Sequence, residues 1–291
     1  MRRLNFHHLY YFWLVAKEGH LTRAAEQNHV SQSALSSQIK QLEEQLKQPL
    51  FIREGKKLLL TEVGTVVLNY AEGIFSLGNE LLATVSGGKG PAVQQLRVGA
   101  VATLSRNFQE NLLRPIMGME NVHLVLESGS LDQLLDHLSV HKLDLVLSNT
   151  PVVAEPQQAW QCRSIAQQNV CLVGQPQQRR RKFRFPEDLA AIKLLVPGAT
   201  SDIRMQFDML CERLKVTPDI YAEVEDMAML RLLARDTGGV AVVPEIVVQD
   251  ELRNQVLQKY CEVPDVKETF YATTAKRHLP SALLEKLLTE V

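Results

Sequence analysis

The sequence has 291 residues, of which 45% are hydrophobic and 22% charged, and its formal net charge is −1. This length exceeds that of one small domain and allows two or three domains with their own cores. It contains no run of eighteen apolar residues, which argues against a transmembrane helix. The first residues lack the apolar centre of a signal peptide, so we expect the protein to stay in the cytoplasm.

The small net charge conceals a division along the chain. Residues 1–60 carry nine Lys or Arg against five Asp or Glu, a net charge of +4, whereas the remainder carries 23 basic and 28 acidic residues. A basic head on an acidic body is typical of a DNA-binding segment attached to a domain with another task.

Four cysteines are scattered without CxxC spacing, which predicts free thiols in a reducing compartment. Cys162 and Cys171 are close enough in sequence to suggest a redox pair. The favoured interpretation is that both are buried and act as small hydrophobes.

Residues 4–18 show the spacing of an amphipathic helix, which Gly19 ends. A second short helix follows at 21–27, with small alanines suited to a close crossing. After a turn at 28–30, Ser31 is a good N-cap for a third helix from Gln32 to about Leu46. The apolar face of this third helix consists of Ala34 or Leu35, Ile39, Leu42 and Leu46. Two short helices, a tight turn and a small-residue crossing predict a helix-turn-helix.

Residues 50–53 and 57–60 flank Glu54-Gly55-Lys56 and predict a hairpin, a wing beside the third helix. Thr61 then caps a long helix. Its apolar positions follow a three-four spacing over three heptads: Leu60, Val63, Val67, Tyr70, Ile74, Leu77 and Leu81. This seam fits either packing on the helix's own domain or pairing with a second chain. The Gly-rich linker at 86–91 isolates the helix and favours pairing.

From Leu96 onward, short apolar runs alternate with amphipathic helices, which predicts an α/β body with mostly parallel strands. The predicted strands are 96–101, 122–127, 143–148, 170–174, 194–197, 220–224, 240–244 and 268–273; the predicted helices include 131–141, 201–214 and 227–235. No GxGxxG or GxxxxGK[ST] motif supports nucleotide binding. The basic run 179–182 is interpreted as a solvated loop, with a second nucleic-acid patch as the minor alternative.

The segment AAEQNHVSQSALSSQIKQLEEQLKQPLFIREGKKLLLTEVG resembles the LysR-type transcriptional regulators. The likeness continues in the body, at His141-Lys-Leu-Asp-Leu-Val-Leu and at Gly239-Val-Ala-Val-Val-Pro244. The resemblance implies an α+β multidomain protein: a winged helix-turn-helix (1–60), a dimerising linker helix and hinge (61–90) and a two-lobed effector-binding domain (91–291) like a periplasmic binding protein. Lobe I would comprise about 91–163 and 268–291, and lobe II about 164–267.

Within this family the nearest likeness is to a regulator of sodium/proton antiport. It is carried by Leu4-Asn5-Phe6, His8-Leu9-Tyr10-Tyr11-Phe12-Trp13, Lys17-Glu18-Gly19 and Leu195-Val196-Pro197-Gly198. It implies that sodium or alkaline pH is one candidate signal and that the protein is an activator. The second lobe departs more from that regulator, which leaves a small organic anion as an equal alternative.

The third helix presents a polar face whose N-terminal side chains are placed to reach base edges in the major groove. Gln32 can form a bidentate pair with adenine, and Ser33 suits several bases. The wing's basic residues are expected to hold the DNA backbone or minor groove. The candidate DNA-binding residues are Ser31, Gln32, Ser33, Ser36, Ser37, Lys40, Arg53, Lys56 and Lys57. The alternative for each is a solvated face that contacts nothing.

The two lobes are expected to bind a small molecule at strand ends and helix starts. The candidates are Thr103, Ser105, Ser128, Ser130, Ser148, Asn149, Thr200 and Ser201, of which Thr103, Ser148 and Thr200 are favoured. Such hydroxyls suit an anion or a polar metabolite, although each could be only a helix cap.

His137 and His141 have metal-binding spacing but no evident acidic or cysteine partner, so neither a metal site nor a cofactor is predicted. A solute-binding protein is disfavoured by the helix-turn-helix. An enzyme is disfavoured because no GxSxG or HExxH signature occurs. The expected partners are double-stranded DNA, a small-molecule or ion effector, RNA polymerase and further copies of the chain, as a homodimer or a dimer of dimers; no membrane partner is expected.

Overall fold

The computed structural model describes residues 3–54, 57–85, 94–153, 160–176, 182–275 and 282–289. The chain divides into two compact units, one of residues 1–92 and 136–142 and the other of residues 93–135 and 143–291. Among the described residues, no helix is long and apolar enough to cross a membrane.

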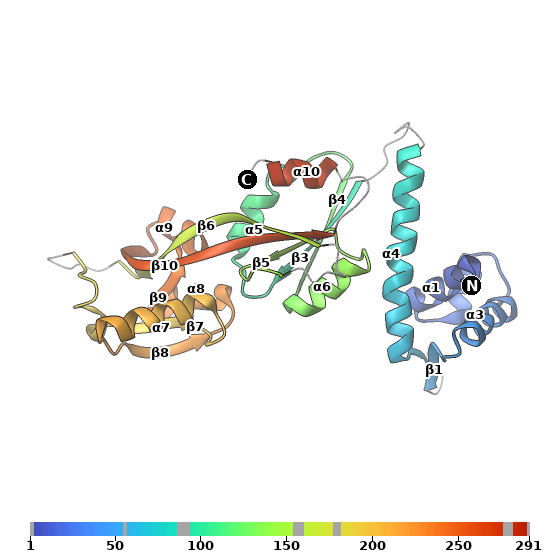
Figure 1. Cartoon of the computed structure of the whole chain (residues 1–291), viewed down its shortest axis with the longest axis horizontal. Coiled ribbons are helices and arrows are strands. Elements are labelled where there is room, and N and C mark those ends of the chain that lie inside the picture. The colour runs from blue at the N-terminus through green and yellow to red at the C-terminus, as the bar shows by residue number, and fades with distance from the viewer. Residues whose placement is uncertain are drawn as a thin grey trace. The chain divides into compact units, whose positions relative to one another are not determined.

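The N-terminal unit begins with three helices, α1 (Phe6–Glu18), α2 (Leu21–Gln27) and α3 (Gln32–Leu46) (Figure 1). The Asn5 side chain caps α1 by accepting the backbone N–H of His7, and Gly19 ends the helix with a left-handed φ of 66°. Only glycine takes that conformation at little cost, which is why the chain turns there. The buried Ala24 and Ala25 let α2 pack closely in the core.

Helix α3 starts where the sequence predicts, because the Ser31 hydroxyl accepts the Ala34 N–H at 3.1 Å. Its buried face is Leu35, Ile39 and Leu42. The sequence allowed either Ala34 or Leu35 on the inward face. Ala34 is exposed, so Leu35 takes that position. These side chains pack in one core with Leu9, Phe12 and Val15 of α1.

Strands β1 (Phe51–Glu54) and β2 (Lys57–Leu60) pair antiparallel and form the predicted wing. The Glu43 carboxylate of α3 fixes the start of this hairpin, because its Oε1 accepts the N–H groups of Leu50 at 2.7 Å and Phe51 at 3.2 Å. The wing is therefore held to the end of the third helix by charge-assisted hydrogen bonds.

The long helix α4 (Glu62–Val85) follows the wing, and the Thr61 hydroxyl accepts the Gly64 N–H at its start. The predicted apolar seam is divided between two environments. Val67 and Ile74 pack with the helix-turn-helix core, whereas Tyr70 (56% exposed) and Leu81 (62% exposed) are open. Packing on its own domain therefore holds for part of the helix, whereas pairing with a second chain stays a prediction for the exposed part.

The second unit is built on one eight-stranded sheet with the order β4-β3-β5-β10-β6-β9-β7-β8. The strands are β3 (Gln94–Val101), β4 (Val122–Gly129), β5 (Leu145–Ser148), β6 (Trp160–Gly174), β7 (Lys193–Pro197), β8 (Asp219–Val224), β9 (Val240–Pro244) and β10 (Gln258–Ala275). The helices are α5 (Arg106–Leu113), α6 (Leu131–Ser139), α7 (Asp202–Leu214), α8 (Met227–Thr237), α9 (Gln249–Arg253) and α10 (Ala282–Thr289), with 3₁₀ turns η1 (Leu189–Ala191) and η2 (Glu245–Val248).

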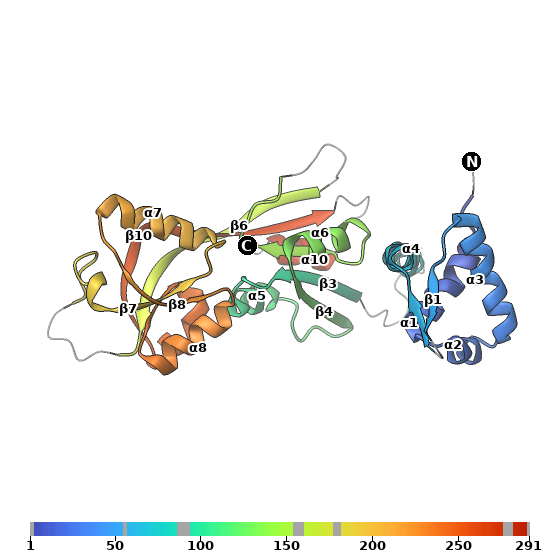
Figure 2. The same ribbon diagram turned by 90° about the horizontal axis from the view of Figure 1, so that it is seen from below.

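The sheet forms two lobes joined by the long antiparallel strands β6 and β10, which run from one lobe into the other (Figure 2). Strand β3 pairs parallel with β4 and β5 in lobe I, and β7 pairs parallel with β8 and β9 in lobe II. The sequence predicted only the ends of the connecting strands, 170–174 and 268–273. The structure extends them to 15 and 18 residues.

Helix α5 of lobe I is tied to lobe II beside the connecting strands. Asn107 donates its side-chain N–H to the carbonyl of Ile246 at 3.0 Å, and Asn111 donates to Gln249 Oε1 at 3.1 Å. The ring of Phe108 stacks on Phe270 of β10 with 3.9 Å between centroids. These contacts fix where the carboxyl ends of the lobe I strands lie relative to β10.

Candidate DNA-binding and effector sites

The polar face of α3 lies opposite its buried face. Gln32, Ser33, Ser37 and Lys40 are exposed, and Ser36 is half-buried. Positions 32, 33, 36, 37 and 40 share one side of a helix with 3.6 residues per turn. The structure thus brings all five predicted side chains of this helix onto one exposed face.

The local contacts that the side chains of this face make are weak. Lys40 Nζ lies 3.9 Å from a carboxylate oxygen of Glu44, with both side chains largely exposed. An ion pair of this kind contributes little to stability. Ser31 is occupied as the helix cap, and its Oγ also lies 3.1 Å from that of Ser33.

The basic residues predicted on the wing are only partly placed. Arg53 lies in β1 and Lys57 in β2, opposite Leu58 and Glu54 respectively. Their side chains, and all of Lys56, fall outside the described part of the chain.

Three residues from distant parts of the sequence form a hydrogen-bonded chain at the carboxyl ends of the lobe I strands. The Thr103 hydroxyl, which follows β3, donates to Asn149 Oδ1 at 3.2 Å. Asn149, which follows β5, donates its Nδ2–H to Glu268 Oε1 of β10 at 3.1 Å. This chain brings together two predicted effector residues and one that the sequence did not single out.

Glu268 is a buried carboxyl group with an incomplete set of partners. The residue is 3% exposed, and its Oε2 has no hydrogen-bond partner among the described residues. Burial raises the pKa of Glu268 to about 7; the Asn149 hydrogen bond opposes this rise, and the negative charge of Asp202 on α7 adds to it. Desolvation disfavours the charged form, and a nearby like charge acts in the same direction.

The remaining predicted effector residues lie outside this hydrogen-bonded chain. Ser105 caps α5 by accepting the Phe108 N–H, and Ser130 accepts the Gln133 N–H at the start of α6. Ser148 is fully buried and donates to the Thr150 carbonyl at 2.7 Å. Three further positions are Ser128 and Thr200, both exposed, and Ser201, whose buried Oγ has no partner among the described residues.

Glu268 and Asp202 are not among the predicted effector residues, because that prediction rests on hydroxyls and amides that follow predicted strands. The available signal was the charge of Glu268 itself, at the start of the segment 268–273, which was predicted as a strand. A carboxylate on a buried strand requires a partner or a function.

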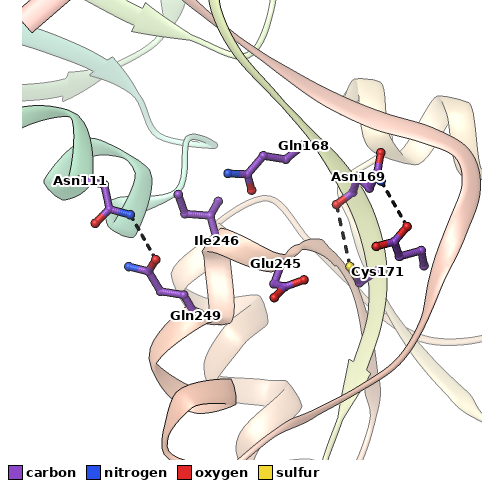
Figure 3. Close-up of a pocket in the computed structure, with 8 residues that line it drawn as sticks. Asn111, Gln168, Asn169, Cys171, Glu245, Ile246 and Gln249 are labelled. Carbon is purple, nitrogen blue, oxygen red and sulfur yellow. Dashed lines mark hydrogen bonds between the residues drawn. The ribbon is translucent and has the colours of Figure 1, made fainter. Parts of the chain in front are cut away.

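A cavity of about 500 Å³ also lies beside β6, lined by residues of α5, β6, η2, α9 and β10 (Figure 3). It is lined by Asn111, Gln168, Asn169, Cys171, Glu245, Ile246, Gln249 and Glu262. Its polar groups are largely paired: Asn169 donates to Glu262 at 3.2 Å, and Lys259 donates to Glu245 at 2.7 Å. None of the predicted effector residues lines it.

The cysteines do not form the suggested pair. Cys162 and Cys171 lie nine residues apart on the single strand β6, a separation of roughly 30 Å at the rise of an extended strand. Burial raises the pKa of the Cys171, Cys211 and Cys261 thiols to about 11, which keeps them in the unreactive thiol form.

Two other sequence features carry no site in the described residues. His137 is buried, and the described residues contain no group of three or more His, Cys, Asp or Glu placed to hold a metal ion. Most of the basic run 179–182 lies outside the described residues.

A winged helix-turn-helix joined by a long helix to a two-lobed α/β domain defines a DNA-binding transcription regulator with an effector-binding domain. Residues 6–65 match the bacterial regulatory helix-turn-helix protein model of the lysR family, and residues 89–291 match the LysR substrate binding domain. The chain belongs to the LysR family of transcriptional regulators, which are not enzymes.

The curated relatives include the transcriptional activator protein NhaR of Escherichia coli strain K12. The two sequences are 28% identical over 99% of this chain and 95% of the relative. The nitrogen assimilation regulatory protein nac of the same organism is also 28% identical, over 83% of this chain and 79% of the relative.

Solved structures show the same fold over the whole chain. A full-length OxyR variant from Pseudomonas aeruginosa aligns with a TM-score of 0.68 at 22% identity, covering 99% of this chain and 94% of that one. Full-length CbnR complexed with its target DNA aligns with a TM-score of 0.66 at 22% identity, covering 99% and 98%. The fold class predicted from the sequence is therefore confirmed.

Proposed function

We propose that this chain is a transcription activator whose response is set by a small effector bound between the lobes, where Thr103, Asn149 and Glu268 meet. The observation that carries the proposal is the hydrogen-bonded chain of these three residues. It connects the carboxyl ends of β3 and β5 to β10, and in open α/β sheets ligands bind outside such strand ends.

For DNA recognition, we propose that the exposed face of α3 enters the major groove. Gln32 and Ser33 lie in its first turn, where side chains of a recognition helix reach base edges. Lys40 and the basic wing residues Arg53, Lys56 and Lys57 would hold phosphates, giving affinity more than specificity.

Dimerisation is proposed through the apolar stripe that α4 leaves uncovered. The exposed apolar side chains of this helix are Val63, Val66, Tyr70, Leu77, Leu81, Leu82 and Val85. Exposed apolar residues at three-four spacing are typical of a helix that pairs with a second helix. A dimer, or a dimer of dimers, would place two copies of α3 on one operator and present the regulator to RNA polymerase.

The effector would act through the lobes. Thr103 and Asn149 belong to lobe I, whereas α7, which carries Asp202, belongs to lobe II. A ligand held by both lobes changes their arrangement only by the difference in its affinity for the two arrangements. Such a ligand would change DNA geometry or transcription rather than abolish DNA binding.

Two classes of signal were open from the sequence: sodium or alkaline pH, and a small organic anion. The unpaired helix-cap hydroxyl of Ser201 suits an anion at a helix N-terminus. Glu268 and Asp202 oppose an anion, because each adds negative charge where it would bind. The carboxyl groups of Glu268 and Asp202 therefore favour sodium or alkaline pH as the signal.

The test is a reporter assay with the full chain and its own promoter, combined with thermal-shift screening against salts and small carboxylates. Thr103→Val removes the donor to Asn149 and is expected to abolish the response while operator binding remains. Ser128→Ala, at an exposed strand end, is the matched control and should respond normally. An undiminished response in Thr103→Val would refute the assignment of the site.

A further inference from the structure

The cavity beside β6 is separate from the proposed effector site, because none of Thr103, Asn149 and Glu268 lines it. Its volume of about 500 Å³ lies within the range of about 300–1,000 Å³ that is usual for small-molecule sites. Its walls come from α5 of lobe I, from η2 and α9 of lobe II and from the connecting strands β6 and β10 (Figure 3). A molecule in this cavity therefore has both lobes within reach.

Two carboxamide side chains at this cavity keep hydrogen-bonding groups free. Gln168 of β6 forms no side-chain hydrogen bond with any described residue, and its side chain extends from β6 toward the α5 side of the cavity (Figure 3). Gln249 of α9 accepts from Asn111 at 3.1 Å, and its own amide N–H groups have no acceptor among the described residues. The cavity thus offers free donors from two elements and a free acceptor, the Gln168 carbonyl oxygen, from one.

The charged groups at the cavity are already matched to one another. Lys259 Nζ lies 2.7 Å from Glu245 Oε2 and 3.5 Å from Glu262 Oε1. Asn169 donates to the other carboxylate oxygen of Glu262 at 3.2 Å. Each carboxylate therefore has a donor, which leaves neither as an unmatched charge for a cationic ligand. Two carboxylates beside one ammonium group also leave a net negative charge, which disfavours an anion.

The lining of the cavity is poor in apolar surface. Among the described residues that line it, Ile246 is the one aliphatic side chain and none is aromatic. An aromatic compound or a nucleobase gains affinity by stacking on aromatic rings or by burying apolar area, so neither suits this cavity. A hydroxyl group both donates and accepts, and therefore matches carboxamides that offer donors and an acceptor.

We propose that this cavity is a second ligand site, for an uncharged compound with several hydroxyl groups, a sugar or a cyclitol. The hydroxyl groups accept from the amide N–H groups of Gln168 and Gln249 and donate to the Gln168 carbonyl oxygen. Because Gln249 belongs to lobe II and its partner Asn111 to lobe I, the ligand stabilises the arrangement in which α5 and α9 meet. This site goes beyond the proposed function and does not depend on it.

The experiment is saturation-transfer difference NMR on the full chain with three panels of small molecules. The first panel contains glucose, ribose and myo-inositol, the second methylammonium and choline, and the third acetate and succinate. Concentrations stay well below those at which sugars stabilise every folded protein by exclusion from its surface. The proposal predicts a saturable signal from the first panel, and the Kd of the responding compound is then measured by titration in each variant.

Gln168→Leu removes one free carboxamide, and Gln249→Glu removes the other's N–H donors while keeping an acceptor for Asn111. Each variant loses hydrogen bonds to the ligand, so its Kd should rise about tenfold. Gln161→Leu, at an exposed glutamine of the same strand outside the cavity, is the matched control and should leave the Kd unchanged. The two test substitutions lie on different elements, so a folding defect in one leaves the other to decide.

Absence of a saturable signal from the first panel, or a Kd that neither Gln168→Leu nor Gln249→Glu changes, overturns the proposal. Signals from the charged panels alone overturn it as well. Thr103→Val separates this cavity from the proposed effector site, because the Kd should be unchanged in that variant. A sugar that fails to bind Thr103→Val and still binds Gln168→Leu occupies the effector site, so the second site is wrong while the proposed function stands.

Discussion

Asn149 Nδ2 donates to Glu268 Oε1 at 3.1 Å, joining residues 119 positions apart in the sequence. This bond occupies one carboxylate oxygen and leaves the other without a partner among the described residues. One loop of lobe I thus holds in place a charge on the strand that connects both lobes. The relationship makes Glu268 sensitive to anything that binds between them.

The stability of the protein should depend on the pH through Glu268. An unperturbed glutamic acid titrates near 4.5, and burial raises the pKa of Glu268 to about 7. The unfolded chain therefore loses this proton first as pH rises, so the folded state loses stability between pH 4.5 and 7, by at most about 3 kcal/mol. Below pH 4.5 the group is protonated in both states and costs nothing by this route.

Glu268→Gln removes this dependence. We expect its free energy of unfolding, measured by urea denaturation without added effector, to exceed that of the native chain by a margin that grows from pH 4.5 to 7 and is constant above. Glu262→Gln is the exposed control and should show no such growth. A margin that shrinks as pH rises would contradict the assigned pKa.

Only glycine should be tolerated at position 64, because the wing lies close to α4 there. A Cβ on Gly64 would lie against the Leu50 carbonyl oxygen, part of the backbone that starts the wing. Gly64→Ala should therefore lower the free energy of unfolding by about 1–3 kcal/mol and weaken DNA binding.

Gly78→Ala is the matched control on the same helix, because a Cβ there meets nothing within 4 Å. Its effect should be opposite, a gain of about 0.5–1 kcal/mol from reduced freedom of the unfolded chain. Chemical denaturation of both variants checks the pair. Equal effects would mean that the wing moves away from α4 without cost.

Dimerisation should depend on the uncovered side of α4. Leu81→Lys is expected to weaken the dimer strongly without loss of monomer stability, because Leu81 is exposed in one chain and would be buried between two. Ile74 is unsuitable for this test, since it packs with the helix-turn-helix core.

Met209→Lys places the same charge at another exposed apolar position, on α7. Light scattering across a concentration series compares the two variants. If Leu81→Lys and Met209→Lys give the same association constant as the native chain, α4 does not form the dimer interface.

The helix-turn-helix could be predicted closely because its information is local. Asn5, Gly19 and Ser31 set helix ends by interactions within three or four residues, and apolar spacing determines the buried faces. The long strands β6 and β10 could not, because their inner stretches are largely polar and alternate little. Their extended structure comes from pairing with each other, a contact between distant segments.

The effector site shows the same limit. Thr103 and Asn149 were predicted because polar residues after apolar strands gather at one edge of a parallel sheet. Glu268 was not, since its role depends on antiparallel pairing of β10 with β5 and β6. Ser105 and Ser130 have the same pattern as Thr103 and are helix caps, a difference that only the backbone geometry reveals.

Specific DNA recognition by the exposed face of α3 is the central claim, and Gln32→Ala tests it most directly. The measurement is binding of the full chain to its operator, found by sequencing DNA recovered with the protein from cells, and to random duplex of equal length. Lys40→Ala is the comparison, with both titrated at several salt concentrations.

We predict that Gln32→Ala weakens operator binding by about 1–3 kcal/mol and leaves random DNA nearly unaffected, because a base contact is lost. Lys40→Ala should weaken both alike and lower the salt slope by about one, because a phosphate contact is lost. If Gln32→Ala instead weakens operator and random DNA equally, or leaves both unchanged, this face of α3 does not read the sequence.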